Sequence, residues 1–180
     1  MNYAEIKTYD IANGPGVRVS FFVSGCTHHC KNCFNEIAWD FNYGEEFTEE
    51  IQDYILEAVS PIHYQGLSLL GGEPMEPNNQ RGLLPLVKAF KEKFPNKNLW
   101  VYTGYVYEDL IHESRARCEV TDELLSYIDV LVDGKFVEEL KDITLRFKGS
   151  SNQRIIDMPQ TLKEKEVVLS PYNNKREGII

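Results

Sequence analysis

Apolar residues along the chain follow two recurring patterns, short runs rich in β-branched and aromatic residues and longer segments with helical spacing. The short runs predict strands at residues 3–11, 17–23, 66–70, 99–102, 129–132, 154–157 and 166–169. Helical spacing predicts helices between a Thr48 cap and Pro61, at residues 83–94, at 107–112 and at 121–127, with a helical turn at 137–140. Because strands and helices alternate, the sequence predicts an α/β fold with a mostly parallel sheet.

Length and composition fit one domain, which we place at residues 1–170, followed by a loosely held tail at residues 171–180. Apolar residues make up 42% of the chain, which is typical of a globular protein rather than a disordered one. The net charge of −9 argues against binding to nucleic acid or to an anionic membrane surface, because both need basic patches. The N-terminus lacks a signal-peptide pattern and no apolar stretch approaches the ~20 residues of a membrane span, so we expect a cytoplasmic protein.

Three of the four cysteines lie within eight residues, at Cys26, Cys30 and Cys33, directly after the strand predicted at 17–23. Thiols crowded in one loop indicate a metal centre, since clustered cysteines in a reducing compartment bind metals more often than they form disulfides. Iron–sulfur clusters are held by cysteine thiolates, commonly four of them. With only three supplied here, one iron of a four-iron cluster would remain open to another ligand.

A closed zinc site is the alternative interpretation of this loop, with His28 or His29 as the fourth ligand. The chain has no second cysteine pair at zinc-finger spacing, and the loop lies at a strand end in an α/β pattern. These features favour an iron–sulfur cluster. The fourth cysteine, Cys118, lies far from the loop in sequence and is interpreted as an ordinary thiol.

Four motifs begin where predicted strands end: the cysteine loop, Gly71-Gly72-Glu73-Pro74, Thr103-Gly104 and Asp133-Gly134. In parallel α/β architectures, ligands bind at the carboxyl ends of the strands, so these motifs are expected to meet at one site. Adjacent glycines let a ligand approach the backbone closely.

The combination of motifs resembles the activating proteins of anaerobic (class III) ribonucleoside-triphosphate reductases, within the radical S-adenosylmethionine (SAM) superfamily. The resemblance spans residues 5–157. The motifs that carry it are Asn13-Gly14-Pro15-Gly16-Val17-Arg18, the cysteine loop with Phe34-Asn35, Trp39-Asp40-Phe41, Gly71-Gly72-Glu73-Pro74, Tyr102-Thr103-Gly104-Tyr105, Val132-Asp133-Gly134-Lys135-Phe136 and Gly149-Ser150-Ser151-Asn152-Gln153-Arg154. It implies a partial, open β/α barrel of the radical SAM type.

The resemblance also implies a chemistry and a set of partners. A [4Fe–4S] cluster held by the three loop cysteines would reductively cleave SAM, and the resulting radical would create a glycyl radical on the large subunit of the reductase. A reducing electron donor such as flavodoxin would supply the electron. Activation of pyruvate formate-lyase or another glycyl radical enzyme is the nearest alternative, and a non-enzymatic zinc-binding module is the alternative of another class.

Further residues receive roles only by resemblance. The backbone of Gly71-Gly72-Glu73-Pro74 would receive the amino group of SAM, with the Glu73 carboxylate holding that segment. Thr103, Asp133 and Lys135 would surround the methionyl carboxylate, where a monovalent cation could also bind. Arg18 would face the site, and residues 149–154 would help to dock the partner's glycyl loop.

Overall fold

The computed structural model describes residues 1–174, and a seven-stranded open sheet runs through them in the order β3-β1-β2-β4-β5-β6-β7. The four central strands pair in parallel, and β1 and β7 run antiparallel to their neighbours. The strands are β1 (Asn2–Asp10), β2 (Val17–Val23), β3 (Glu45–Glu46), β4 (Tyr64–Gly71), β5 (Asn98–Tyr102), β6 (Val130–Asp133) and β7 (Arg154–Asp157). The predicted α/β class and the parallel core of the sheet are therefore confirmed.

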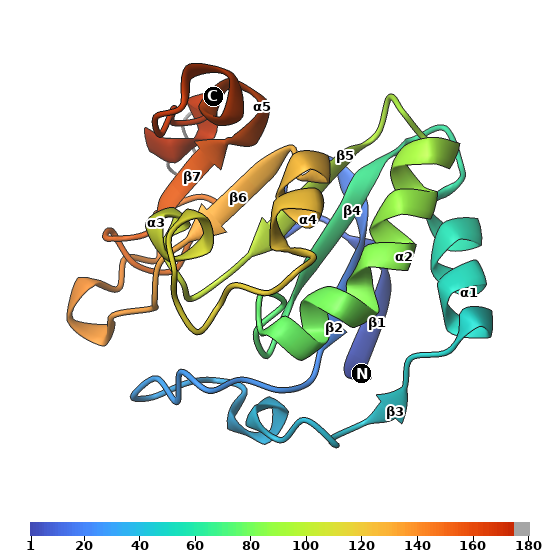
Figure 1. Cartoon of the computed structure of the whole chain (residues 1–180), viewed down its shortest axis with the longest axis horizontal. Coiled ribbons are helices and arrows are strands. Elements are labelled where there is room, and N and C mark those ends of the chain that lie inside the picture. Colours follow the sequence, from blue (N-terminus) through green and yellow to red (C-terminus); the bar gives the residue numbers. More distant parts are fainter. Residues whose placement is uncertain (175–180) are drawn as a thin grey trace.

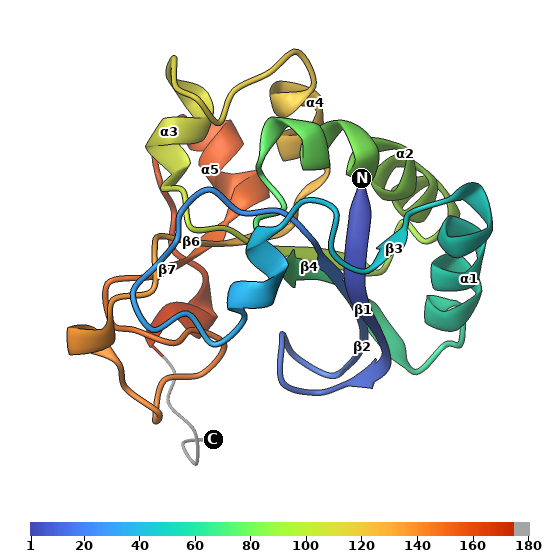
Figure 2. The same ribbon diagram turned by 90° about the horizontal axis from the view of Figure 1, so that it is seen from below.

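Helices cover one face of this sheet (Figures 1 and 2), where α1, α2 and α4 pack side by side. The helices are α1 (Glu49–Val59), α2 (Pro77–Lys93), α3 (Tyr107–Ile111), α4 (Thr121–Tyr127) and α5 (Met158–Glu164), with 3₁₀ helices η1 (Glu36–Trp39), η2 (Glu138–Leu140) and η3 (Pro171–Asn174). None of the helices in residues 1–174 combines the length and the apolar character needed to cross a membrane.

Alternation along the strands divides the buried residues between the two faces of the sheet. The helix-covered face carries the main core, which includes Leu69, Val101 and Leu131 from the three adjacent strands β4, β5 and β6. The opposite face carries a smaller cluster that contains Trp100 and Val132. Both faces are therefore buried at the centre of the sheet, as expected for parallel strands.

Arg18 lies on this second face, toward the start of β2, and not at the cysteine loop that follows the strand's other end. The side chain is fully buried, and its guanidinium donates to Ser68 Oγ at 2.8 Å and to the carbonyl oxygens of Leu67 and Asn98 at 3.0 and 3.2 Å. Burial lowers the pKa of Arg18 to about 10. These acceptors hold Arg18 near the start of the strand, and Arg18 is not among the residues that line the cavity described below.

Several predicted boundaries differ from the structure. Helix α2 begins at Pro77 rather than at residue 83, and α5 was not predicted. Residues 166–169 do not form a strand; only Leu169 bridges Ile156 of β7. Residues 171–174 of the predicted tail form η3, where the Asn173 side chain accepts from the Ile155 amide at 2.8 Å, whereas residues 175–180 lie outside the described part of the chain.

Candidate metal centre and cofactor site

The cysteine loop leaves β2 and is held against the segment that carries η1. The Gly25 amide donates to Ala38 O at 2.8 Å, and the Cys26 amide donates to Trp39 O at 3.2 Å. Cys26 is buried, whereas Cys30 and Cys33 are half-buried, and all three are free thiols. Hydrogen bonds therefore hold the backbone at the start of the loop. The three thiols are not engaged in disulfides and are available to a metal centre.

The first turn of α2 fixes the same loop from the other side. Glu76 Oε1 accepts from the Thr27 amide at 2.9 Å and from the Thr27 hydroxyl at 2.6 Å. The buried Asn79 amide donates to Ser24 O and Glu73 O, each at 3.0 Å. Glu76 and Asn79 are not predicted from the sequence, although polar residues directly ahead of an apolar helical pattern are a signal for such contacts.

Gly71 and Gly72 bring the end of β4 into direct contact with the cysteine loop. Gly71 has a φ of 113°, which favours glycine, and a Cβ there would lie 2.6 Å from Val23 backbone atoms. A Cβ on Gly72 would lie 2.6 Å from Gly25 O. The Glu73 amide donates to Gly25 O at 2.8 Å. These glycines therefore permit two backbone segments to pack together beside the cysteines.

The Glu73 carboxylate connects three strand ends. Its Oε1 accepts from the Met75 amide at 2.9 Å and from the Thr103 hydroxyl at 2.7 Å. Its Oε2 accepts from the Gly104 amide at 2.7 Å and lies 2.8 Å from His28 Nε2. The carboxylate is almost completely buried, and each oxygen already has two partners. Glu73 therefore connects the cysteine loop with the ends of β4 and β5.

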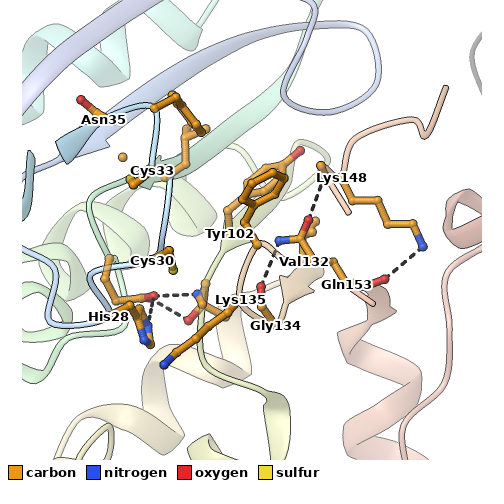
Figure 3. Close-up of a pocket in the computed structure, with 18 of the residues that line it drawn as sticks. His28, Cys30, Cys33, Asn35, Tyr102, Val132, Gly134, Lys135, Lys148 and Gln153 are labelled. Atoms are coloured by element: carbon orange, nitrogen blue, oxygen red, sulfur yellow. Dashed lines mark hydrogen bonds and ion pairs between the residues drawn. The ribbon is translucent and has the colours of Figure 1, made fainter. Parts of the chain in front are cut away.

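One cavity of about 640 Å³ lies at the carboxyl ends of β2, β4, β5 and β6. Figure 3 shows Cys30, Cys33, His28 and Lys135 around it. The residues from the sequence analysis that line it are Cys26, Cys30, Cys33, Gly71, Gly72, Glu73, Thr103 and Lys135. Pro74 and Asp133 are not among the lining residues. The structure thus brings together most of the predicted site residues from four segments far apart in sequence.

Asp133 turns away from the cavity. Its buried carboxylate accepts from the Tyr107 amide at 2.7 Å and from Arg154 Nη2 at 2.5 Å. Arg154 also binds Glu108, at 2.7 Å. Hydrogen bonds to Asp133 and then to Glu108 raise the pKa of Arg154. The hydrogen bonds of the Asp133 carboxylate therefore join β6 to β7 and to the start of α3.

Lys135 enters the cavity from a turn that residues 149–153 hold in place. Gln153 Nε2 donates to Gly134 O at 2.9 Å, and Asn152 Nδ2 donates to Lys135 O at 2.8 Å. Gln153 Oε1 in turn accepts from the Gly149 amide at 2.8 Å. The polar residues of this segment thus make internal contacts that support Lys135.

The thiols experience burial and nearby charge. Burial, followed by the carboxylates of Glu73 and Glu76, raises the pKa of Cys26 to about 11. Burial also raises the pKa of Cys30, although the Lys135 ammonium opposes this effect. A buried thiol becomes a stable thiolate when it binds a metal, because the metal replaces the proton.

The donor set fits an iron–sulfur cluster. Three unpaired thiols face one cavity, and the glycines of β4 leave room beside them. Within residues 1–174, no three His, Cys, Asp or Glu side chains converge closely enough to hold a single metal ion. The three thiols therefore line one cavity but do not surround a single point as the ligands of one metal ion would.

Comparisons with known proteins agree with this donor set. A family model described as a 4Fe-4S single cluster domain matches residues 12–156. The chain is 43% identical over 157 residues to the anaerobic ribonucleoside-triphosphate reductase-activating protein of Vibrio cholerae, covering 86% of this chain and 97% of that protein. It is 44% identical over 155 residues to the protein of the same name from Escherichia coli K12, covering 85% and 96%.

A third relative of the same name, from Enterobacteria phage T4, is 39% identical over 155 residues, covering 86% of this chain and 93% of the phage protein. The matched region spans the cysteine loop and every segment that lines the cavity. With a cluster-domain match over most of its length and relatives of this similarity, the chain belongs to the family of anaerobic ribonucleoside-triphosphate reductase-activating proteins.

Proposed function

We propose that this protein is a radical SAM activase that cleaves SAM reductively at a [4Fe–4S] cluster and generates a glycyl radical on the large subunit of the anaerobic reductase. The open sheet with its helices on one face is then a partial β/α barrel of the radical SAM type. One observation carries the proposal: three free thiols, a pair of glycines and Lys135 line the same cavity at the carboxyl ends of parallel strands.

The residues of the cavity take distinct roles in this proposal. Cys26, Cys30 and Cys33 hold the cluster, and when bound the reduced cluster supplies the electron that breaks a carbon–sulfur bond of SAM. The backbone at Gly71–Gly72 receives the amino group of SAM. Lys135, which lines the cavity, pairs with the methionyl carboxylate.

The geometry argues against direct contact of Thr103 and Asp133 with SAM. Thr103 lines the cavity, but its hydroxyl already donates to Glu73, so we assign it to holding the segment. The Asp133 carboxylate is neutralised by Arg154 and turned from the cavity, so we assign it no contact with SAM or with a monovalent cation.

The names of the relatives support the anaerobic reductase as the partner that is activated. In this proposal the radical removes a hydrogen atom from one backbone glycine of that partner. A flavodoxin-like reductant would supply the electron. Mixing the reduced protein and SAM with purified reductase should produce the doublet of a glycyl radical in the electron paramagnetic resonance spectrum. A doublet with pyruvate formate-lyase and none with the reductase would instead identify an activase of another glycyl radical enzyme.

The cluster itself is tested on protein purified without oxygen and reconstituted with iron and sulfide. We expect a reduced four-iron signal that changes when SAM is added. Cys26→Ala, Cys30→Ala and Cys33→Ala should each abolish the cluster, whereas Cys118→Ala, the matched control away from the cavity, should keep it. Stoichiometric zinc without iron in the wild-type protein would refute the mechanism and favour the zinc-binding alternative.

A further inference from the structure

The two adjacent histidines of the cysteine loop occupy opposite environments. The side chain of His28 is only 3% exposed, and its ring meets Tyr105 edge-on with centroids 4.4 Å apart. His29 is exposed and stacks on Trp39 at 4.3 Å. His28 therefore points into the protein between two cysteines that bracket it in sequence, whereas His29 points outward.

His28 is the side-chain link between the cysteine loop and the Glu73 carboxylate. The Glu73 carboxylate accepts hydrogen bonds from the Thr103 hydroxyl and the Gly104 amide, so we assign the proton of this contact to His28 Nε2, which lies 2.8 Å from Glu73 Oε2. The same carboxylate holds Thr103 and Gly104 at the end of β5. One carboxylate thereby connects the loop of the cysteines with the ends of β4 and β5.

The end of β5 leaves room for the His28 ring. A Cβ on Gly104 would lie 2.7 Å from two atoms of that ring, Cδ2 and Nε2, so only glycine permits this approach without displacement. This contact is independent of the Glu73 hydrogen bond. Two separate features of the chain therefore accommodate an imidazole at position 28.

The other ring nitrogen is not explained by folding. His28 Nδ1 is buried and has no hydrogen-bond partner among the described residues. A buried polar atom without a partner destabilises the fold, so packing alone would favour an apolar ring here. His28 is also among the residues that line the cavity of the proposed cofactor site.

We infer that His28 is a positioning residue that keeps the cysteine loop in register with Gly71–Gly72 and the end of β5, so that the surfaces that bind SAM are formed in advance. This inference rests on the proposed function. Without the link, only a fraction of the molecules has the three segments aligned, and the apparent affinity for SAM falls by that fraction. The cysteines themselves remain able to hold a cluster.

The test compares three variants of the reconstituted protein. His28→Ala removes the link, His28→Gln keeps an N–H donor that can reach Glu73, and His29→Asn is the matched control because Asn tolerates the left-handed backbone at that position (φ 48°). Iron and sulfide content and the dissociation constant of SAM, measured by calorimetry without turnover, are the readouts. We expect normal cluster content in all three, a dissociation constant raised about tenfold or more in His28→Ala, and values near wild type in the other two.

The outcomes separate the inference from the function on which it rests. Wild-type protein that binds no SAM refutes the proposed function. Wild-type binding together with unchanged affinity in His28→Ala refutes the positioning role alone. If His28→Ala takes up no cluster, the dissociation constant of SAM in His28→Gln is the deciding measurement. A value near wild type supports the role of the N–H donor at position 28, and a raised value overturns it.

Discussion

Replacing Gly72 by alanine tests whether the contact between β4 and the cysteine loop is as tight as the structure indicates. The φ of Gly72 is not in the left-handed region, so alanine introduces no backbone strain and the effect is purely steric. The new Cβ would lie 2.6 Å from Gly25 O and 2.9 Å from Ala38 O. Both neighbours are backbone atoms, so no side-chain rotation can relieve the overlap.

The magnitude follows from the displacement that the overlap requires. Ordinary van der Waals contact begins at 3.4 Å, so the two segments must separate by about 0.8 Å. Such overpacking costs about 1–3 kcal/mol. The shift also weakens the hydrogen bond from the Glu73 amide to Gly25 O, worth about 1 kcal/mol. We expect a loss of about 2–4 kcal/mol in the free energy of unfolding.

Urea denaturation of the reduced apoprotein measures this loss, and iron content after reconstitution measures its effect on the loop next to Cys26. Gly149→Ala is the matched control: Gly149 is exposed, and the new Cβ would meet the Phe136 ring at 3.1 Å, which the ring can relieve by rotating. A Gly72→Ala protein with wild-type stability and full iron content would show that the two segments are not packed as described.

Two further predictions concern groups outside the cavity. Arg154→Met leaves the buried carboxylate of Asp133 without its cation and should lower the free energy of unfolding by about 3 kcal/mol in a urea titration. Arg81→Met breaks an exposed ion pair and should lower it far less, and equal effects of the two changes would contradict the assignment. Burial raises the pKa of Asp10, but hydrogen bonds, above all from Ser20, outweigh it and hold the pKa below its usual value. Ionised Asp10 therefore stabilises the folded protein above the pKa that Asp10 has in the unfolded chain, and this contribution is lost as the pH falls through the lower pKa of the folded state. Wild-type protein should lose more free energy of unfolding between about pH 5 and pH 2 than Ser20→Ala does. Identical acid profiles of the two proteins would refute this.

Local pattern was sufficient for most strands and for the starts of α1, α3 and α4. The strand at 17–23 and the strand at 154–157 have the predicted bounds, and the Thr48 hydroxyl caps α1 by accepting from the Ile51 amide at 3.4 Å. The start of α2 was missed because its first turns bury polar residues. Gln80 Nε2, for example, donates to Met75 O at 2.7 Å and to Ala116 O, 36 residues away, at 2.6 Å. Such polar contacts do not contribute to the apolar period from which the helix was predicted.

The candidate site was predictable to the extent that it depends on strand ends. Parallel strands bring their carboxyl ends to one edge, and this rule alone placed the cysteine loop beside Gly71–Gly72 and Thr103. The supporting contacts were not predictable, because each joins residues far apart in sequence whose types are common on any surface. Glu76 binding to Thr27 is one case, and His28 binding to Glu73 is another.

Asp133 shows that the end of a strand predicts which edge of the sheet a residue occupies, but not which face of the sheet its side chain occupies. Side chains alternate along a strand, so Asp133 shares a face with Leu131, which belongs to the helix-covered core, and not with Val132, which lines the cavity. Both faces of β6 are apolar, so the residue types could not reveal which parity points to the site. The carboxylate therefore contacts Arg154 and the amide at the start of α3, and the next two residues, Gly134 and Lys135, line the cavity instead.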